Sequence, residues 1–286
     1  ADVDAFVADF KANFVVEDAG ADGPEPEAIE TGVGRVNHLP MGDASGAPII
    51  FIHGYGGDLS NWMFNQEELS ASHTTYAIDL PGHGRSTKEV GAGDVDSLAK
   101  AVLAFMDVKG VHKAHLVGHS MGGAICLVLA LDSADRVASV TALAPGGLGP
   151  DINMDYINGF IAEKRAKKLR PVLEMLVANP EMISKDMIED VLKFKRLDGV
   201  DQALTTLRDG CFPGGTQAGD GGLRAKLESI NVPIQIIVGK VDQIIPASHS
   251  HGLPAAIKVT TFDDAGHMPH MEKAAAVNDL IRSLAT

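Results

Sequence analysis

Short runs of apolar residues recur along most of the chain at the lengths typical of β-strands. Several of them are almost continuously hydrophobic, as expected for strands that helices cover on both faces. The pattern therefore predicts seven strands, in the runs GRVNHLP (34–40), PIIFIHG (48–54), TTYAIDL (74–80), AHLVGHS (114–120), VASVTALAPG (137–146), PIQIIVGK (233–240) and KVTTFDDAG (258–266).

Amphipathic segments with helical periodicity alternate with these strands. The clearest are residues 96–110, 121–134 and 271–286. Strands that alternate with helices favour a mostly parallel sheet with right-handed crossover connections. We therefore expect an α/β fold in which helices flank a central sheet.

One long region interrupts this alternation. Residues 147–225 contain helical patterns, notably over 158–180 and 184–210, and no convincing strand. A helical insertion between strands of an α/β sheet is expected above the strand ends, where such folds bind their ligands. We interpret residues 147–225 as a helical cap, which leaves residues 32–146 and 226–286 as the core.

The first 31 residues have a different character. They begin with the amphipathic stretch ADVDAFVADFKANF and continue into EDAGADGPEPEAIETG, whose Pro, Gly and acidic residues are typical of a linker. We therefore expect the folded domain to begin near Gly32.

Composition and charge narrow the class of protein. With 45% hydrophobic and 22% charged residues, the chain has the composition of a soluble globular protein. A net charge of −14 argues against nucleic acid and anionic membranes as partners, and no apolar stretch reaches the roughly 18 residues of a membrane span. Two distant cysteines and the lack of a signal peptide favour the cytoplasm, without a disulfide framework. No residue spacing indicates a metal site, and we expect no cofactor in this chain.

The segment Gly118-His119-Ser120-Met121-Gly122 lies where a predicted strand meets a predicted helix. A serine at such a sharp turn presents its hydroxyl above the sheet, and the glycines leave room for neighbouring backbone. The amide of Met121, at the start of the helix, is then placed to stabilise an oxyanion. Because Gly and Ser are also common turn residues, this motif alone leaves a purely structural turn open.

A glycine-rich loop follows an earlier strand, in the sequence FIHGYGG. After His53 and Gly54, the amide of Tyr55 is in the expected place for a second oxyanion donor beside Met121. Gly54, Gly56 and Gly57 would let the backbone approach a substrate closely. We expect the oxyanion hole to consist of the amides of Tyr55 and Met121.

An acid and a histidine follow the serine in the order required for a catalytic triad. Asp242 comes just after a buried strand, and His267 lies in the loop before the last helix. A serine hydroxyl is a poor nucleophile until a histidine removes its proton, and a carboxylate must orient that histidine. The order Ser120, Asp242, His267 is that of the α/β-hydrolase fold.

Other polar residues near these motifs have structural interpretations. Asp263 and Asp264 are on the strand end and turn leading to His267, so Asp242 is the better candidate for the acid. His270 is expected to be a supporting or packing residue. In DLPGHGRS (79–86), an Asp79–Arg85 contact is expected instead of catalysis.

The substrate pocket is expected to include Gly54, Trp62 and His119. Trp62 and the neighbouring Asn61 follow the glycine-rich loop of residues 54–57, which we call the oxyanion loop, although Trp62 fits a core position equally well. His119 is expected to point away from Ser120 along its strand. In the helix after Ser120, Cys126 fits a buried structural thiol.

A group of basic residues in the cap most often marks a solvated helix face, but it would also attract an anionic acyl carrier such as coenzyme A. These residues are Lys164, Arg165, Lys167, Lys168 and Arg170.

With HGYGG, GHSMGG, GKVDQIIP and GHMPHMEK in register, the chain resembles the α/β-hydrolase superfamily, which implies a helical cap inserted after the sixth strand. Four further segments, HGYGGDLSNWMFNQ, YAIDLPGHGRSTK, LRPVLEMLVANP and LKFKRLDGVDQAL, resemble the hydrolase-like region of dihydrolipoyl acetyltransferases from bacterial acetoin dehydrogenase complexes. Those proteins carry a lipoyl domain ahead of this region. The resemblance thus implies that residues 1–31 are a linker or the tail of a missing lipoyl domain.

This narrower resemblance implies other components of an acetoin dehydrogenase complex as partners, and coenzyme A or dihydrolipoamide as co-substrate. The H-x-x-x-D-G motif of other 2-oxo acid dehydrogenase acetyltransferases is absent, so acetyl transfer would run through Ser120, His267 and Asp242.

The expected function is that of a serine-nucleophile acyl hydrolase or acyltransferase acting on a small ester or thioester. The triad alone does not distinguish hydrolysis from transfer. Three alternatives stay open: a stand-alone carboxylesterase, a C–C or enol-lactone hydrolase on the same triad, and a non-catalytic assembly domain.

Overall fold

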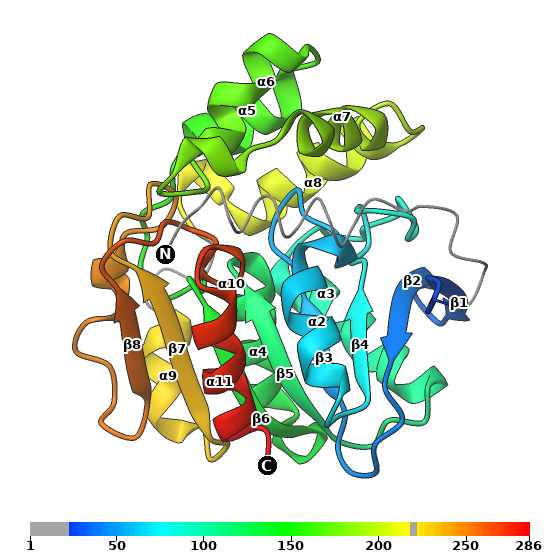
Figure 1. Ribbon diagram of the computed structural model, residues 1–286, viewed down its shortest axis with the longest axis vertical. Coiled ribbons are helices and arrows are strands. Elements are labelled where there is room, and N and C mark those ends of the chain that lie inside the picture. The colour runs from blue at the N-terminus through cyan, green and yellow to red at the C-terminus, as the bar shows by residue number, and fades with distance from the viewer. Residues whose placement is uncertain (1–22, 218–221) are drawn as a thin grey trace.

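The computed structural model describes residues 23–217 and 222–286, which form one eight-stranded sheet with helices on both faces (Figure 1). The strand order is β1-β2-β4-β3-β5-β6-β7-β8. The strands are β1 (Glu27–Thr31), β2 (Gly34–Met41), β3 (Ile49–Ile52), β4 (Thr75–Ile78), β5 (Ala114–His119), β6 (Val137–Leu143), β7 (Ile234–Gly239) and β8 (Lys258–Phe262).

The predicted mostly parallel sheet is confirmed. Strands β3 to β8 pair in parallel, whereas β2 pairs antiparallel with both β1 and β4. The chain passes from β3 to β4 on one side and then returns to place β5 on the other side of β3. Such a reversal of direction opens a crevice at the carboxyl ends of the two strands, and ligands bind in that crevice in open α/β sheets.

Side chains that alternate along the strands form two apolar layers, one on each face of the sheet. The flanking helices are α2 (Met63–Ser70), α3 (Val95–Val108), α4 (Met121–Asp132), α10 (Pro269–Glu272) and α11 (Ala274–Leu284). In β3, Ile49 and Phe51 pack with α2 and α11, while Ile50 and Ile52 pack with α3 and α4. Strands buried on both faces need apolar residues at every position, which explains the continuous run IIFI.

The helical insertion after β6 is also confirmed. It consists of α5 (Met154–Ala162), α6 (Ala166–Glu174), α7 (Lys185–Phe194), α8 (Val200–Cys211) and the short α9 (Gly222–Lys226). Figure 1 shows α5 to α8 together above the carboxyl ends of the strands, whereas α9 lies lower, beside the sheet, where it contacts α4. We call α5 to α8 and their connections the cap.

Local sequence explains where the cap helices begin. The side chain of Asn153 accepts the amides of Asp155 and Tyr156 at the start of α5, and Ser184 accepts the amide of Met187 at the start of α7. Such side-chain bonds satisfy amides that have no acceptor within the helix.

The residue after α7, Lys195, is buried inside the cap. Its ammonium group donates to the carbonyls of Phe160 and Glu163, and so joins the end of α7 to the end of α5.

The expected boundary of the folded domain needs correction. Residues 27–31 form β1, an edge strand paired with β2, although we expected them to belong to a linker. Backbone pairing with β2 holds this strand, and its side chains are largely exposed. The strand therefore needs no pattern of apolar residues. The expected linker or lipoyl-domain tail over residues 1–22 lies outside the described residues. None of the helices in residues 23–217 and 222–286 has the length and apolar character needed to cross a membrane.

Candidate active site

Ser120 lies at the turn between β5 and α4, with φ 54° and ψ −114°. This positive φ is rare for any residue other than glycine and is sustained only when the surroundings hold it. The Ser120 amide donates to the carbonyl of Leu143 at 2.8 Å, and the Ser120 carbonyl accepts the amide of Gly146 at 3.0 Å. Strand β6 and the loop after it therefore hold the serine in its strained conformation.

The two glycines that flank Ser120 are required by close backbone packing. A Cβ on Gly118 would lie 2.3 Å from the carbonyl oxygen of Gly122 and 2.5 Å from the Sγ of Cys126. A Cβ on Gly122 would lie 2.2 Å from the carbonyl oxygen of Ile52, at the end of β3. Helix α4 thus packs directly on β3 and β5 only because these residues have no side chain.

We expect Gly122→Ala to destabilise the fold and reduce the reactivity of Ser120. Alanine is favoured over glycine within helices by about 1 kcal/mol, but overpacking against rigid backbone costs typically about 1–3 kcal/mol or more. The Cβ would meet the carbonyl oxygens of both Ile52 and His53, so α4 must move away from the loop after β3. Urea unfolding should show a net loss, and labelling by a fluorophosphonate should slow.

The control for this substitution is Gly32→Ala, because a Cβ on Gly32 would meet nothing within 4 Å. It should change the free energy of unfolding by less than about 0.5 kcal/mol. Equal stability and labelling of the Gly122→Ala protein and the wild type would contradict the close-packing explanation.

Asp242 and His267 form a buried pair. The Nδ1 of His267 is 2.7 Å from the Oδ2 of Asp242, and the side chains are 2% and 1% exposed, respectively. The other carboxylate oxygen, Oδ1, accepts the amides of Ile244 and Ile245 at 2.7 and 3.0 Å. These bonds fix the carboxylate and favour the tautomer in which Nδ1 of His267 carries its proton, leaving Nε2 as the basic atom.

The competing acids have different surroundings. Asp263 and Asp264 are exposed, and they pair with Lys240 and Lys273 at 2.8 and 2.6 Å. Only Asp242, of these three carboxylates, bonds to His267 among the described contacts.

The loop after β3, which contains Tyr55, contacts the turn at Ser120. A Cβ on Gly54 would lie 3.0 Å from the Cβ of Ser120, so this loop and the serine turn are in direct contact. As the first residue of α4, Met121 has an amide without an intrahelical acceptor. These placements are compatible with the expected oxyanion hole of Tyr55 and Met121.

Two buried histidines that were not expected to contribute hold the oxyanion loop. The Nε2 of His83 accepts the amide of Gly56 at 3.0 Å, and the Nε2 of His53 accepts the amide of Leu80 at 3.0 Å. Burial lowers the pKa of both imidazoles, in the case of His83 to well below its ordinary value. Both side chains are therefore neutral acceptors, which is the form that these bonds require.

Asp79 also supports this region. Its carboxylate accepts the amides of Leu59 and Arg85 and the side-chain amide of Asn37, at 2.8 to 2.9 Å. The expected Asp79–Arg85 contact is present, but it involves the backbone of Arg85 and not its guanidinium group.

Three aromatic side chains pack in a row behind His267. The ring of His119 is 4.7 Å from that of His267 and 4.6 Å from that of His270, and the ring of Trp62 is 4.5 Å from that of His270. Burial lowers the pKa of His119 to well below its ordinary value and that of His270 to about 3. His270 is thus a neutral packing residue. The expectation that Trp62 lines the pocket is wrong, since its side chain is fully buried against Phe51 and His270.

A cavity of about 80 Å³ lies between the core and the cap. Its core side is lined by Ser120, His267, Gly54, His119 and Asn61, and Gly54 and His119 are two of the three residues expected in the substrate pocket. The cap contributes apolar side chains, and no Lys, Arg, Asp or Glu lines the cavity among the described residues. The cap residues are Tyr156, Ile157, Phe160, Leu173, Leu176, Ile183, Met187 and Val191.

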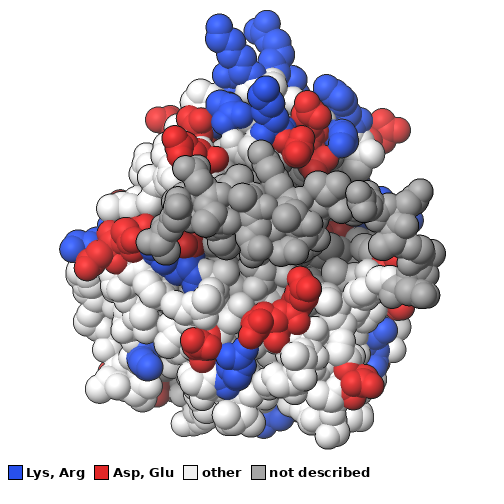
Figure 2. All heavy atoms as spheres, in the orientation of Figure 1, with Lys and Arg blue, Asp and Glu red and all other residues white. Residues whose placement is uncertain are grey.

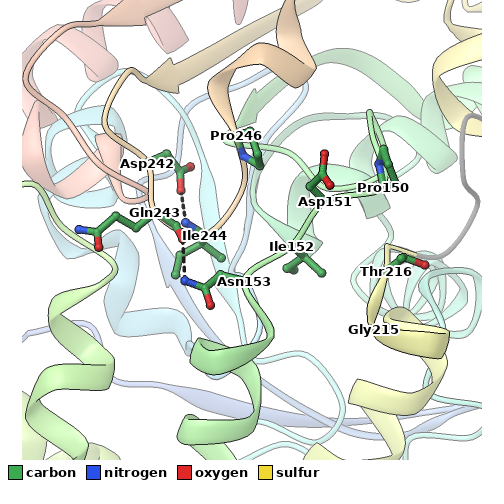
Figure 3. A pocket seen from close by; sticks show the side chains of 10 residues that line it. All are labelled: Pro150, Asp151, Ile152, Asn153, Gly215, Thr216, Asp242, Gln243, Ile244 and Pro246. Atoms are coloured by element: carbon green, nitrogen blue, oxygen red, sulfur yellow. Dashed lines mark hydrogen bonds between the residues drawn. The ribbon is translucent and has the colours of Figure 1, made fainter.

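A second cavity, of about 290 Å³, lies beside the loop that carries Asp242 (Figure 3). It shares Ile152 and Ile244 with the first cavity, but Ser120 and His267 do not line it. The Asn153 amide donates to the Ile244 carbonyl at 2.9 Å, and the Asn153 side chain donates to the Gln243 carbonyl at 2.8 Å. The segment that leads into α5 is thus bonded to the loop that carries Asp242.

The basic residues of the cap gather at the end of the molecule farthest from the sheet (Figure 2). Neither cavity is lined by any of the five basic residues singled out in the sequence, Lys164, Arg165, Lys167, Lys168 and Arg170. Lys164 pairs with Asp201, and Arg170 donates to the Ile183 carbonyl at 2.8 Å, so both stabilise the cap itself.

Cys126 is buried as expected, and burial raises the pKa of its thiol. The described residues contain no cluster of His, Cys, Asp and Glu side chains suited to a metal ion.

Comparison with known proteins places this geometry in a family. Residues 47–274 match the model of the alpha/beta hydrolase fold. A meta-cleavage product hydrolase from Pseudomonas fluorescens superposes with a TM-score of 0.81 over 90% of this chain and 96% of its own, at 21% identity.

Two curated relatives are far more similar in sequence. Each is a dihydrolipoyllysine-residue acetyltransferase component of an acetoin cleaving system. The protein from Pseudomonas putida is 44% identical over 97% of this chain and 74% of its own length. The protein from Cupriavidus necator is 42% identical over 87% of this chain and 66% of its own length, so the chain corresponds to only part of these relatives. On the family match, the shared fold and these identities, the chain belongs to the α/β-hydrolase family and is a homologue of the acetoin-cleaving acetyltransferase component.

Proposed function

We propose that this chain transfers an acyl group, through a covalent ester on Ser120, from a dihydrolipoyl thioester to the thiol of coenzyme A. The observation that carries this proposal is the 2.7 Å bond between His267 and Asp242, in a site where His267 and Ser120 line the same cavity. An acetyl group is the favoured cargo, because the two similar relatives are named as acetyltransferase components.

The first half of the reaction uses the described groups in order. The Oγ of Ser120 attacks the thioester carbonyl while Nε2 of His267 takes the hydroxyl proton, and Asp242 stabilises the resulting imidazolium. The amides of Tyr55 and Met121 donate to the oxyanion. The C–S bond then breaks, the leaving thiolate takes the proton from His267, and the acyl group remains as an ester on Ser120.

The second half reverses these steps with another nucleophile. The thiol of coenzyme A loses its proton to His267 and attacks the acyl ester, and breakage of the C–O bond returns the proton to Ser120. Water attacking the same intermediate would yield a free acid. The apolar cap above Ser120 supports transfer, because excluding water protects a reactive ester from hydrolysis.

The lining of the cavity also bears on the substrate class. An anionic substrate would need a cationic partner in a buried site, and no Lys or Arg lines this cavity among the described residues. A neutral, aliphatic acyl group fits the lining. This makes an acyl thioester a better candidate than the carboxylate-bearing substrates of C–C bond hydrolases, despite the shared fold.

Supplying S-acetyl-dihydrolipoamide with and without coenzyme A tests the proposal. We expect acetyl-coenzyme A to form with the wild type and with Ser133→Ala, a control at the far end of α4, but not with Ser120→Ala. Chromatography of acetyl-coenzyme A and acetate separates the two acceptors. If acetate is the product even with coenzyme A present, and its release depends on Ser120, the protein is a thioester hydrolase and not a transferase. Equal inactivity of wild type and Ser120→Ala would contradict both transfer and hydrolysis.

A further inference from the structure

We infer that Glu272 is a positioning residue that joins the cap to the loop carrying His267, so that the state of the cap controls the placement of His267. This inference rests on the proposed function of the Ser120 site. It assigns a role to a carboxylate that the triad does not use.

Glu272, at the end of α10, accepts three backbone amides. Its Oε1 accepts Gly266 at 2.9 Å and Met268 at 3.2 Å, the residues on either side of His267. Its Oε2 accepts Ala178 of the cap at 2.8 Å and also lies 3.0 Å from the amide of Gly266. Hydrogen bonds to a carboxylate are stronger than those to neutral acceptors, so this half-buried side chain firmly connects the His267 loop to Ala178 of the cap, which lies 94 residues before Glu272 in the chain.

The cap segment beside Glu272 also contacts the His267 loop directly. The amide of His267 donates to the carbonyl of Leu176 at 2.9 Å. A Cβ on Gly266 would lie 2.9 Å from the backbone of Val177 and Ala178, so the two segments are in backbone contact. Residues 176–178 of the cap are therefore bonded to the His267 loop at two points, one of which is Glu272.

The same cap segment lines the cavity in which we place the substrate. Leu173 and Leu176 face it from the cap, and Met268 faces it from the His267 loop. An acyl chain that fills the cavity would press on Leu176, whose carbonyl receives the amide of His267. Substrate contacts in the cap would in this way act on the position of the histidine, where an error of about 1 Å can cost roughly 100-fold in rate.

The backbone bond from His267 to Leu176 also joins the loop to the cap, but the polar side chains around the loop other than Glu272 have partners elsewhere. His119 holds the His267 carbonyl from the core side, with its Nε2 donating at 2.7 Å, and it makes no described bond to the cap. Asp264 and Lys273 pair with each other at the surface. Glu272 is the charged side chain that, among the described contacts, bonds both to the cap and to the His267 loop.

Glu272→Gln is expected to keep the bonds to the His267 loop while removing the bond to Ala178 of the cap. With its carbonyl oxygen toward Gly266 and Met268, glutamine keeps the bonds to the loop, but its NH₂ group then faces the amide of Ala178 and cannot accept from it. In Glu272→Ala all of these bonds are lost. The matched control is Asp264→Asn, which neutralises an exposed carboxylate in the same loop whose ion-pair partner, within residues 23–217 and 222–286, is Lys273.

Turnover of p-nitrophenyl acetate, its pH profile and hydrogen exchange measure the effect. For Glu272→Gln we expect kcat to fall by about 10-fold with KM changed less than about twofold, since placement and not binding is affected. The amide of His267 should exchange faster with solvent. Glu272→Ala should show a larger loss and an altered pH profile, and Asp264→Asn should match the wild type.

The outcomes distinguish this inference from the proposed function. Glu272 variants with lower thermal stability but unchanged kcat, pH profile and exchange at His267 would overturn the inference, and Glu272→Gln decides the matter if Glu272→Ala does not fold. A wild-type protein inert to both the ester and a fluorophosphonate would overturn the proposed function. Hydrogen exchange would then still test the connection between cap and loop.

Discussion

Ser120→Ala is expected to lower kcat/KM for acyl substrates by roughly 10,000-fold or more, the usual effect of removing the nucleophile of a serine triad. The loss is large because His267 and Asp242 act through the hydroxyl of this serine and have no other nucleophile to activate. Substrate binding should persist, since the apolar cap side chains that line the cavity are unchanged. Initial rates and a binding measurement on the same preparation test this separation.

A second variant at this position distinguishes chemistry from folding. Alanine keeps the unfavourable positive φ of Ser120, so Ser120→Ala should have close to wild-type stability. Ser120→Gly should be equally inactive but more stable by about 1 kcal/mol, because glycine adopts φ 54° without strain. Turnover retained by either variant would show that Ser120 is not the nucleophile.

The sequence predicts most of the site because its chemistry depends on local rules. Gly118 and Gly122 flank Ser120 at a strand-to-helix turn, and the structure shows backbone atoms within 2.3 Å of where their Cβ atoms would lie. Asp242 and His267 follow strands β7 and β8, whose carboxyl ends meet at the same edge of the sheet. A parallel sheet brings such loops together regardless of their separation along the chain.

Features that depend on pairing between distant segments were not predictable in this way. Strand β1 has exposed, acidic side chains and is defined by hydrogen bonding to β2. Trp62 follows the oxyanion loop in sequence, yet α2 begins immediately after it and directs the ring into the core. The roles of His83 and Glu272 arise from bonds to backbone amides up to 94 residues away, which no local pattern encodes.

Acidification is expected to destabilise the folded protein steeply below about pH 6.5. Burial lowers the pKa of six buried histidines: to about 3 for His270, to well below the ordinary value for His83 and His119, and below it for His38, His53 and His115. In the unfolded chain each would titrate near 6.5. The unfolded state therefore binds more protons between these pKa values, and folding is disfavoured as the pH falls.

The effect is large because several groups act together. Each histidine contributes a slope of about 1.4 kcal/mol per pH unit over the range in which it is protonated in the unfolded chain but neutral in the folded protein, and these slopes add. Typical domains are stable by only about 5–15 kcal/mol, so we expect the summed loss to unfold the protein in acid, above the pKa of about 3 of His270. Above pH 6.5 this stability is fully present. Urea unfolding at several pH values and constant salt measures the slope.

One of these histidines permits a direct test of whether their protonation causes the loss of stability. Both ring nitrogens of His270 are buried without a hydrogen-bond partner in the described part of the structure, and its ring packs against Trp62 and His119. His270→Phe should therefore retain the packing while removing one titrating group, which lowers the slope by about 1.4 kcal/mol per pH unit. An unchanged slope in this variant would mean that other groups take up the protons.

Activity should also fall in acid because of His53 and His83. The Nε2 atoms of these two histidines accept the amides of Leu80 and Gly56, and these bonds hold the oxyanion loop. An imidazolium cannot accept a hydrogen bond, so protonation of either ring would break its bond and release the loop.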